Sequence, residues 1–439
     1  MRLICMTANN TYPEAPKGCY SLSRLKFKGP ELNKFWVGGE VFLSNGDLVG
    51  LKNMEFQKIW PLPEGNQGFQ ALLLGDHVAL NIHDGEVVEY KLLTRARCEK
   101  QEDQSSLPEA PHRPIINNLY NAQVSQKWSQ FLALLRSFFK ERGMLEVETP
   151  SLVVCPGSEP TLDYFETKFF LQSKSQPFFL PTSPELHLKK MISAGWSDIY
   201  EIKKCYRNNE IGVHHQPEFW MLEFYRSYAN LELIELEFQE LFDYLYAQKF
   251  LLSPLGSITK ITMADLFKTH VNFNLSPQTS KEQLYQLATR LKLTVHREND
   301  SWDDLFFYIF VDFIEPKIEK ISGPVLIYNY PPSQAALARL TREGWADRFE
   351  IYINGLEIAN AFHELNDPHE QEARLNKDQK ERLRLGKAPF VMDHDFLQAL
   401  KNGLPPCSGV AVGLERLFMA LHGIPKIQSL KPFPLNAPE

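Results

Sequence analysis

The segment RNNEIGVHHQPEF, residues 207–219, gathers side chains that suit the binding of a nucleotide. The planar guanidinium of Arg207 can hydrogen-bond a phosphate, and Phe219 offers an aromatic face on which a nucleobase can stack. His214 or His215 could reach the base or a phosphate as well. A polar hairpin tip without a ligand carries similar residues, so this segment alone leaves both interpretations open.

A second phosphate contact is predicted near the C-terminus, in SGVAVGLERLFMALHG. The small residues from Gly409 to Gly413 let a backbone approach a ligand closely, and Arg416 follows at the start of an apolar helix. Small residues also precede helices in ordinary cores. The motif therefore supports phosphate binding only in combination with Arg207.

Three glutamates, Glu350, Glu357 and Glu364, recur every seven residues in RFEIYINGLEIANAFHELNDP. Residues seven apart on one strand point to opposite faces, but a turn at Asn354-Gly355 would form a hairpin in which Glu350 and Glu357 face each other. Paired carboxylates in one cleft are typical ligands of Mg²⁺. The alternative is a surface hairpin with solvated acids.

The elements that must position these residues are visible in the hydrophobic patterning. Apolar residues recur at helical spacing through VSQKWSQFLALLRSFFKERG up to Gly143, and MLEVETPSLV then predicts a strand that Pro150 stops. Further strands are predicted in WSDIYEIKKCYR, FWMLEFYRSY, PVLIYNY and RFEIYINGLEIANAF, and further helices at 230–250, 281–292 and 368–386. Strands and helices without regular βαβ alternation indicate an α+β domain.

The region before residue 106 has a different character. Turn signals between apolar runs, at Asn45-Gly46 and Asp84-Gly85, predict hairpins and a small, mostly-β domain such as a five-stranded barrel. The stretch EDQSSLPEAPHRP, rich in proline and serine, indicates an interdomain linker. We expect domains at 1–105 and 118–439, with the linker at 106–117.

Composition excludes several classes of protein. The 439 residues are 44% hydrophobic and 23% charged, with no apolar run of 18 residues and no apolar signal peptide, so we expect a soluble cytoplasmic protein without a membrane partner. The six cysteines form no CxxC pair, which argues against a zinc site or a disulfide framework. The net charge of −7 provides no general attraction for nucleic acid.

Taken together, the motifs resemble those of class II aminoacyl-tRNA synthetases over about residues 118–428. The first helix with EVETP resembles motif 1, YRNNEIGVHHQPEFWMLEFY resembles motif 2 and GVAVGLERL resembles motif 3, while EIANAFHELNDP is similar to the lysyl branch. The resemblance implies an antiparallel sheet with flanking helices and a homodimer built on motif 1. It also implies a reaction that joins a carboxylate to ATP and releases pyrophosphate.

The resemblance assigns a role to each candidate residue. It makes Arg207 and Arg416 the catalytic residues, holding the α- and γ-phosphates of ATP, and it places Mg²⁺ on Glu350 and Glu357. The implied ATP site consists of Arg207, Asn209, His215, Phe219, Glu350 and Arg416. The implied amino-acid site consists of Glu185, Glu223, Tyr225, Asn360, Phe362, Glu364 and Ala411. The acids among these suit a diamino acid, lysine or β-lysine.

Four stretches, PTSPELHLKKM, YPPSQAALARL, GLEIANAFHEL and PPCSGVAVGLERL, most resemble the branch that attaches (R)-β-lysine to a lysine of elongation factor P. Ala411 belongs to this resemblance, because lysyl-tRNA synthetases have glycine at that position. We therefore expect an ATP-dependent ligase with elongation factor P as acceptor. Two alternatives stay open: a lysyl-tRNA synthetase that charges tRNA, and a non-catalytic paralogue.

The sequence departs from this branch in two respects. The branch has no N-terminal domain, whereas a lysyl-tRNA synthetase has an OB barrel there that binds the anticodon. Residues 1–105 carry 12 basic and 13 acidic side chains, which suit a phosphate-rich partner poorly, so tRNA is the less favoured acceptor. Asn209 replaces the usual motif 2 glutamate, and Gln216 and Glu415 replace Asn and Asp. An amide can still hydrogen-bond adenine, so we expect activity.

Overall fold

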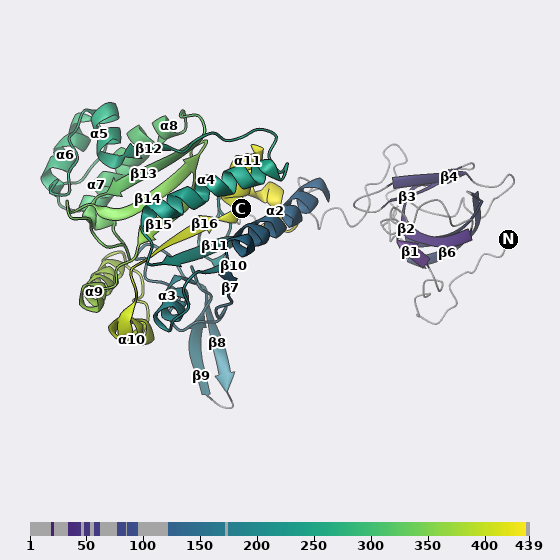
Figure 1. Cartoon of the computed structure of the whole chain (residues 1–439), viewed down its shortest axis with the longest axis horizontal. Helices are drawn as coiled ribbons and strands as arrows, with labels where there is room; N and C mark the ends of the chain where they lie inside the picture. The colour runs from purple at the N-terminus through teal and green to yellow at the C-terminus, as the bar shows by residue number, and fades with distance from the viewer. Residues whose placement is uncertain are drawn as a thin grey trace. The chain divides into compact units, whose positions relative to one another are not determined.

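The computed structural model describes residues 19–21, 34–44, 48–52, 57–61, 77–84, 86–94, 122–171 and 174–435 (Figure 1). The chain forms two compact units, one reaching Lys127 and including Gln428–Pro434, the other formed by Trp128–Ile427 and Leu435–Glu439. The predicted linker at 106–117 and the predicted turn at 45–46 lie outside the described residues, so the domain limits stay predictions. No helix in the described ranges combines the length and apolar character needed to span a membrane.

The N-terminal unit contains one β-sheet. Its described strands are β1 (Cys19–Ser21), β2 (Lys34–Ser44), β3 (Leu48–Lys52), β4 (Gln57–Pro61), β5 (His77–His83) and β6 (Glu86–Thr94). They pair in the order β4-β3-β2-β5-β6, and β1 adds in parallel to β2. The β5–β6 pair is antiparallel, which confirms the hairpin predicted at Asp84-Gly85. The mostly-β prediction is confirmed, but the described part has six strands, and the predicted number of five is wrong.

The larger unit is built on an eight-stranded sheet with the order β12-β13-β14-β15-β16-β11-β10-β7. Its strands are β7 (Leu145–Glu146), β10 (Ile199–Tyr206), β11 (Glu218–Ser227), β12 (Thr259–Thr262), β13 (Pro324–Tyr330), β14 (Ala346–Ile353), β15 (Leu356–His363) and β16 (Cys407–Gly413). All neighbours are antiparallel except the two outermost pairs, β12–β13 and β7–β10. The predicted α+β class with an antiparallel sheet is confirmed.

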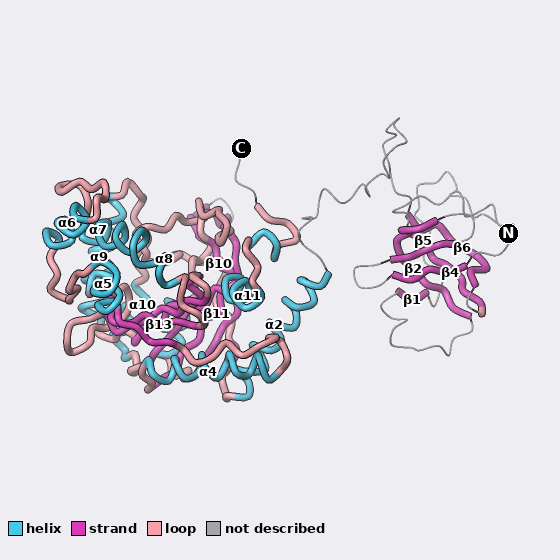
Figure 2. Tube along the Cα trace, turned by 90° about the horizontal axis from the view of Figure 1, so that it is seen from above, coloured by secondary structure: helices cyan, strands magenta, loops and turns pink. Residues whose placement is uncertain are grey.

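Two long helices cover one face of this sheet, α2 (Ala122–Glu141) and α4 (Leu231–Ala247). The ring of Phe139 in α2 lies 5.0 Å from that of Phe224 in β11, and Phe238 in α4 lies 6.1 Å from the same ring. Figure 2 shows both helices on the same side of the sheet. Because side chains alternate along β11, Glu223 and Tyr225, the neighbours of Phe224, project to the opposite face of the sheet.

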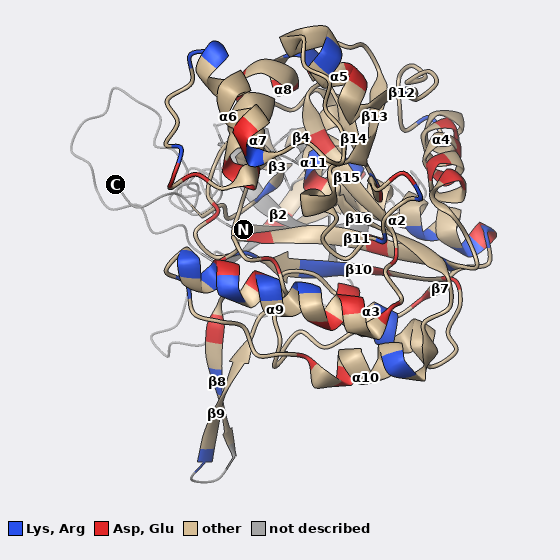
Figure 3. Cartoon of the chain, turned by 90° about the vertical axis from the view of Figure 1, so that its left-hand side faces the viewer, with Lys and Arg blue, Asp and Glu red and all other residues tan. Residues whose placement is uncertain are grey.

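Three more helices lie together next to the sheet: α3 (Glu185–Ser193), α9 (Pro368–Arg384) and α10 (His394–Gly403) (Figure 3). Leu188 and Ile192 of α3 share a buried cluster with Phe396 and Leu400 of α10 and Leu375 of α9. The cluster fixes α3 on the body of the protein. The side chains in the first turns of α3 are thereby held in place for the site.

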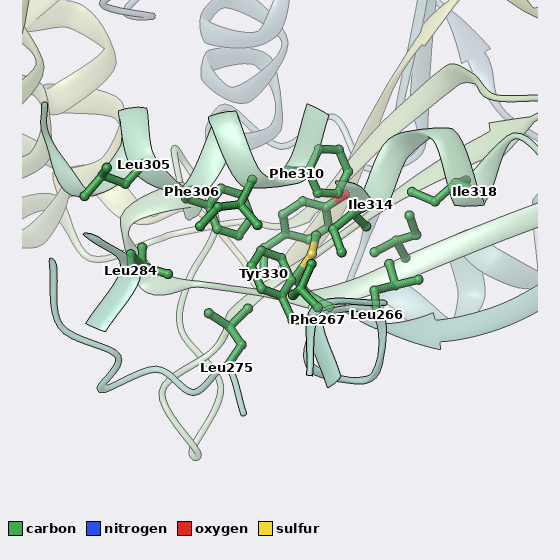
Figure 4. Packing of buried hydrophobic residues seen from close by; sticks show 14 of the residues in the cluster. Leu266, Phe267, Leu275, Leu284, Leu305, Phe306, Phe310, Ile314, Ile318 and Tyr330 are labelled. Carbon is green, nitrogen blue, oxygen red and sulfur yellow. The ribbon is translucent and has the colours of Figure 1, made fainter. Parts of the chain in front are cut away.

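A helical insertion connects β12 to β13 and has its own hydrophobic core (Figure 4). It comprises α5 (Met263–Val271), α6 (Lys281–Arg290), α7 (Trp302–Ile309), the π-helical turn η4 (Phe310–Ile314) and α8 (Glu315–Ile318). Phe267 and Phe306 stack at 5.4 Å, and Tyr330 from β13 belongs to the same cluster. The insertion therefore supports the side chain of Tyr330.

Most of the predicted elements are confirmed, with one strand too long and several elements missed. The strand predicted from Leu145 to Pro150 is only the two-residue β7, because beyond it Thr149 bonds through its backbone N–H to the side chain of Glu201 (2.9 Å) and leaves the strand ladder. The sequence analysis missed several elements of this unit: the strands β12 and β16, the helices α3, α5, α7, α8 and α10, and the hairpin of β8 (Glu166–Leu171) and β9 (Lys174–Phe179).

Candidate active site

One row of paired residues crosses the middle of the sheet on the face opposite α2 and α4. Glu350 pairs with Asn360, Asn360 with Ala411, and Ala411 with Glu223. Residues that pair across antiparallel strands project to the same face. The structure thus brings a residue predicted for ATP, Glu350, next to three predicted for the amino acid.

The next row contains Arg348, Phe362, Gly409 and Tyr225, again paired in that order. Gly409 is required there, because a Cβ atom on it would lie 2.2 Å from Cε1 of Tyr225 and 2.7 Å from Oε1 of Glu364. We expected the small residues to admit a ligand. At Gly409 the freed space is instead filled by Tyr225 and Glu364, two residues predicted for the amino-acid site.

A bulge in the β14–β15 hairpin places Glu357. The predicted turn is confirmed, with φ of 52° at Asn354 and 78° at Gly355, but Glu350 pairs with Asn360, so the predicted direct pairing with Glu357 is wrong. Tyr352 pairs with Glu357, whereas its neighbour Ile351 pairs with Ala359. Ile358, between Glu357 and Ala359 in β15, is therefore an extra residue that bulges from the strand. A regular strand would direct Glu357 away from the site, and the bulge returns it to the face of Glu350.

Glu350 is held by three side chains that the sequence analysis missed. Its Oε2 accepts hydrogen bonds from the hydroxyls of Tyr330 (2.6 Å) and Tyr352 (2.7 Å), and Arg348 donates to its Oε1. Arg348 also donates to Oδ1 of Asn360 (2.9 Å). Arg348 and Tyr352 stand two residues on either side of Glu350, a spacing that predicts a shared face on a strand. No sequence signal points to Tyr330.

Arg416, in the first turn of α11 (Leu414–His422), joins two of the predicted residues. Its Nη1 lies 3.5 Å from Oε2 of Glu357, and its Nη2 contacts Nε2 of His215. Partial burial of the ring, and then the charges of Arg416 and Arg207, lower the pKa of His215 to about 4. The imidazole is therefore neutral and accepts a hydrogen bond from Arg416.

Arg207 lies over the aromatic ring of Phe219, with its guanidinium carbon 5.3 Å from the ring centroid. Its buried Nε makes no hydrogen bond to any described residue. A buried donor without a partner is costly, so this nitrogen is available for an anion from a ligand. Phe219 is on the face of β11 that carries Glu223, because four residues separate them.

Two replacements in the loop between β10 and β11 have structural explanations. Asn209 is exposed and has a φ of 63°, in the left-handed region that asparagine tolerates better than glutamate. Gln216 is buried, and its amide exchanges two hydrogen bonds with the backbone of Leu435, at 3.0 and 2.9 Å. A hydrogen bond from this amide to adenine stays a prediction, because its second N–H and its second oxygen lone pair are not used by Leu435.

Glu185, Glu223 and Glu364 converge as predicted, but around a lysine that was not predicted. The ammonium of Lys189 lies 2.5 Å from Oε1 of Glu185 and 2.5 Å from Oε2 of Glu364. Glu223 accepts a hydrogen bond from the hydroxyl of Ser183 (2.5 Å). The spacing of Glu185 and Lys189, four residues apart on a helix, was the available signal. We call Glu185, Glu223, Glu364 and Lys189 the acidic cluster.

Burial dominates the electrostatics of this acidic cluster. It raises the pKa of Glu223 well above its ordinary value, and the nearby Glu185 adds to the shift. It also raises the pKa of Glu364 to about 8, although the Lys189 ammonium opposes the change. Burial thus favours the protonated form of these carboxyl groups, and a ligand that brings an ammonium group would favour their ionised form.

Glu350 and Glu357 are the candidates for a metal site. Burial, and then the neighbouring charge of Glu350, raises the pKa of Glu357, while Arg416 opposes this shift. No group of three or more His, Cys, Asp or Glu side chains suited to a metal occurs among the described residues. Two carboxylates on one face fit Mg²⁺ only if a ligand such as a phosphate supplies further oxygen atoms.

Comparison with known proteins identifies the class. Residues 115–437 match the family of class II tRNA synthetases (D, K and N), a span that contains the eight-stranded sheet and every side chain described above. The chain belongs to this family. The family predicted from the motifs is therefore confirmed.

Within it, the chain is similar to proteins named elongation factor P (R)-β-lysine ligase. It is 36% identical over 332 residues to the one from Hamiltonella defensa subsp. Acyrthosiphon pisum (strain 5AT), which covers 74% of this chain and 97% of that one. The corresponding protein of Vibrio cholerae is 37% identical over 71% of this chain and 95% of its own length. The corresponding protein of Avibacterium paragallinarum is 38% identical over 70% of this chain and 94% of its own length. The predicted likeness to this branch is confirmed.

Proposed function

We propose that this protein is an ATP-dependent, AMP-forming ligase that adenylates lysine or β-lysine and transfers it to a lysine side chain of elongation factor P. The observation that carries the proposal is one face of the sheet, on which a single row of paired residues runs from Glu350 to Glu223 of the acidic cluster. Arg207 and Arg416 act on Glu357 at the Glu350 end of this row. Guanidinium groups suit the phosphates of ATP, and carboxylates suit the two ammonium groups of a diamino acid. The shared name of the relatives supports elongation factor P as acceptor.

In the proposed ATP complex, Arg207 holds the α-phosphate, Arg416 the γ-phosphate, and adenine stacks on Phe219. The unbonded Nε of Arg207 supports an anion there, and neutral His215 keeps Arg416 oriented without competing for the phosphate. The exposed Asn209 would contact ATP from the loop tip. Mg²⁺ bound by Glu350 and Glu357 would spread the negative charge of the phosphates.

The chemistry follows from this arrangement. A carboxylate oxygen of the amino acid forms a bond to the α-phosphorus, the bond from that phosphorus to the bridging oxygen breaks, and pyrophosphate leaves. The amine of the acceptor lysine then attacks the acyl carbon, AMP leaves, and the surplus proton of the amine passes to solvent. Both steps depend on positioning and charge neutralisation, so the first needs no general base.

The amino acid would lie over the two residue rows, with its ammonium groups toward the acidic cluster. Tyr225 and Phe362 would contact its methylene groups, and Asn360 its polar end. Ala411 lies between Asn360 and Glu223 in the sheet register, which supports a methyl group close to the α-carbon. The α-carbon of β-lysine is a plain methylene, which an adjacent methyl group tolerates better than an ammonium.

We also propose a homodimer that forms through α2 and β7, the elements that correspond to motif 1. Leu145 in β7 is 52% exposed although it is a large apolar residue at the edge of the sheet, and a partner would cover it. Sedimentation should give a dimer at micromolar concentration. A stable monomer would refute this part of the proposal.

The proposed domain at 1–105 is not assigned a part in adenylation. It carries nearly balanced charges, so we expect weak, salt-sensitive binding of tRNA. A translation factor as acceptor places the reaction in the cytoplasm. Tight, salt-tolerant and lysine-tRNA-selective binding would instead favour the synthetase reading.

The decisive experiment incubates the full chain with ATP, labelled lysine or β-lysine, and either purified elongation factor P or tRNA. Label on elongation factor P is the expected result, and label on tRNA would establish a lysyl-tRNA synthetase. Pyrophosphate exchange is measured in parallel without an acceptor. No exchange with any diamino acid would indicate a non-catalytic paralogue.

A further inference from the structure

Lys189 is the least expected member of the acidic cluster. Its side chain is 0% exposed, and its ammonium lies 2.5 Å from a carboxylate oxygen on each side, from Glu185 and from Glu364. Burying an ammonium group this completely is costly unless partners compensate it. A lysine here must therefore contribute something that an apolar side chain of similar size would not.

We propose that Lys189 is a positioning residue of the amino-acid site, a built-in cation that holds the carboxyl groups of Glu185 and Glu364 in place for the ammonium groups of the substrate. The inference rests on the proposed function, because it assumes that the acidic cluster receives a diamino acid. It adds to that function a residue that contacts the carboxylates rather than the substrate.

The first argument is geometric. Glu185 keeps 17% of its side chain exposed while Lys189 keeps none, so the carboxylate, and not the lysine, is accessible from outside the acidic cluster. Oε2 of Glu364 is buried and has the Lys189 ammonium 2.5 Å away as its partner, and a carboxylate oxygen can accept more than one hydrogen bond. This oxygen retains the capacity to accept a hydrogen bond from a ligand.

The second argument is the charge balance. The groups that face Lys189 and Glu364 are Glu185 from α3, Glu223 and Tyr225 from β11, and the buried thiol of Cys407 from β16. Tyrosine and cysteine stay neutral, because burial raises the pKa of each hydroxyl or thiol. Three carboxyl groups against one ammonium leave two negative charges when all are ionised. A diamino acid brings two ammonium groups.

The third argument is the effect of the carboxylates on one another. Two buried carboxylates close together do not both ionise readily at neutral pH, and Glu185 already raises the pKa of Glu364. The Lys189 ammonium opposes this rise in the pKa of Glu364. Burial disfavours the charged form of Lys189, but the carboxylates of Glu185 and Glu364 hold the pKa of Lys189 above its ordinary value. Without Lys189, the Glu364 carboxyl group would keep its proton to a higher pH, and the site would lose affinity for a substrate ammonium.

The test compares Lys189→Met with Lys190→Met by lysine-dependent and β-lysine-dependent pyrophosphate exchange. Lys190 is the matched control, because it is the next residue of α3 and its ammonium bonds to Asp393 (2.7 Å), away from the acidic cluster. For Lys189→Met we expect KM for the amino acid to rise about 10- to 100-fold, as for loss of one charged hydrogen-bond partner. The kcat and the KM for ATP should change less than about threefold.

The pH profile separates positioning from a merely structural contribution. In Lys189→Met the rise of kcat/KM with pH should shift to higher pH, while Lys190→Met should follow the wild type. Lys189→Gln, which retains a donor but no charge, should show the same shift and serves if the methionine variant does not fold. Folding is checked by thermal unfolding.

Three results would overturn the inference: an unchanged KM for the amino acid, equal losses for both substrates together with kcat, or the same effect in Lys190→Met. An inactive wild-type enzyme would instead refute the proposed function. If neither Lys189 variant folds, Lys189 is required for the fold, and the inference that it acts on substrate binding is rejected.

Discussion

The close approach of Tyr225 to Gly409 permits a sharp test of the proposed amino-acid site by Gly409→Ala. The added Cβ would lie 2.2 Å from Cε1 and 2.5 Å from Cδ1 of Tyr225, where carbon atoms in contact are about 3.5–4.0 Å apart. The Tyr225 ring must therefore retreat by more than about 1 Å. Its backbone is fixed by pairing with Gly409 itself, so the ring has to leave its position against the sheet.

We expect two effects of this substitution. Overpacking of a well-packed site costs about 1–3 kcal/mol of the free energy of unfolding. The displaced hydroxyl of Tyr225 also loses its 3.2 Å hydrogen bond to Oε2 of Glu223, and the new methyl displaces Glu364. KM for lysine should rise at least about tenfold, as for the loss of a hydrogen bond to a charged group, with KM for ATP nearly unchanged.

Gly413→Ala is the matched control for this experiment. Gly413 is in the same strand and on the same face, but the atoms nearest to its Cβ would be those of the Arg416 side chain, at ordinary contact distances from 3.8 Å, and its φ of −73° suits alanine. Pyrophosphate exchange and thermal unfolding are measured for both variants. Wild-type KM for lysine in a folded Gly409→Ala variant would show that Tyr225 and Glu364 do not bind the substrate, and would refute the proposed site.

Three further predictions address other parts of the site. Arg207→Ala and Arg416→Ala should each lower the rate of exchange about 100- to 1,000-fold with the fold intact, and full activity in either variant would exclude its assigned contact with ATP. Because the raised pKa of Glu364, about 8, leaves its carboxyl group protonated at neutral pH, kcat/KM for lysine should increase as pH rises through about 8 and then level off. A flat profile from pH 6.5 to 9 would contradict this. Ala411→Gly should raise the use of α-lysine relative to β-lysine by about 10- to 200-fold, and an unchanged ratio would show that Ala411 does not select between them.

The sequence predicted those parts of the site that depend on local patterns. Residues in one hairpin loop, such as Arg207 and Phe219, or beside a glycine-containing turn, such as Glu350, were recognisable from types and spacing. Their assignment to a shared face followed once strands were expected on either side of the loop and the turn. The same reasoning gave the α+β class, because the strands and helices were long and clearly periodic.

The features of the site that could not be predicted depend on contacts between residues far apart in the sequence or on strand register, and the residue pattern of a single strand or helix does not indicate them. The bulge at Ile358, between Glu357 and Ala359, shifts the register by one residue, and nothing in the local composition distinguishes this hairpin from a regular one. For Gln216, the deciding partner is Leu435, 219 residues further along the chain. Local patterning therefore placed the residue near the nucleotide loop but could not show that its amide was already bonded.

Lys189 illustrates the most consequential of these failures. A lysine followed by another lysine on a helix is expected at the surface, and Lys190 does form a partly exposed ion pair with Asp393. Lys189 is buried instead because α3 turns it toward Glu364, which arrives from the end of β15, 175 residues later. Three acids read from the sequence suggested a strongly negative site, whereas the fold supplies one positive charge of its own. The preference for a diamino acid would then depend on how far the three carboxyl groups ionise against Lys189 and the substrate, so the specificity of the site is a property of four side chains and not of the acids alone.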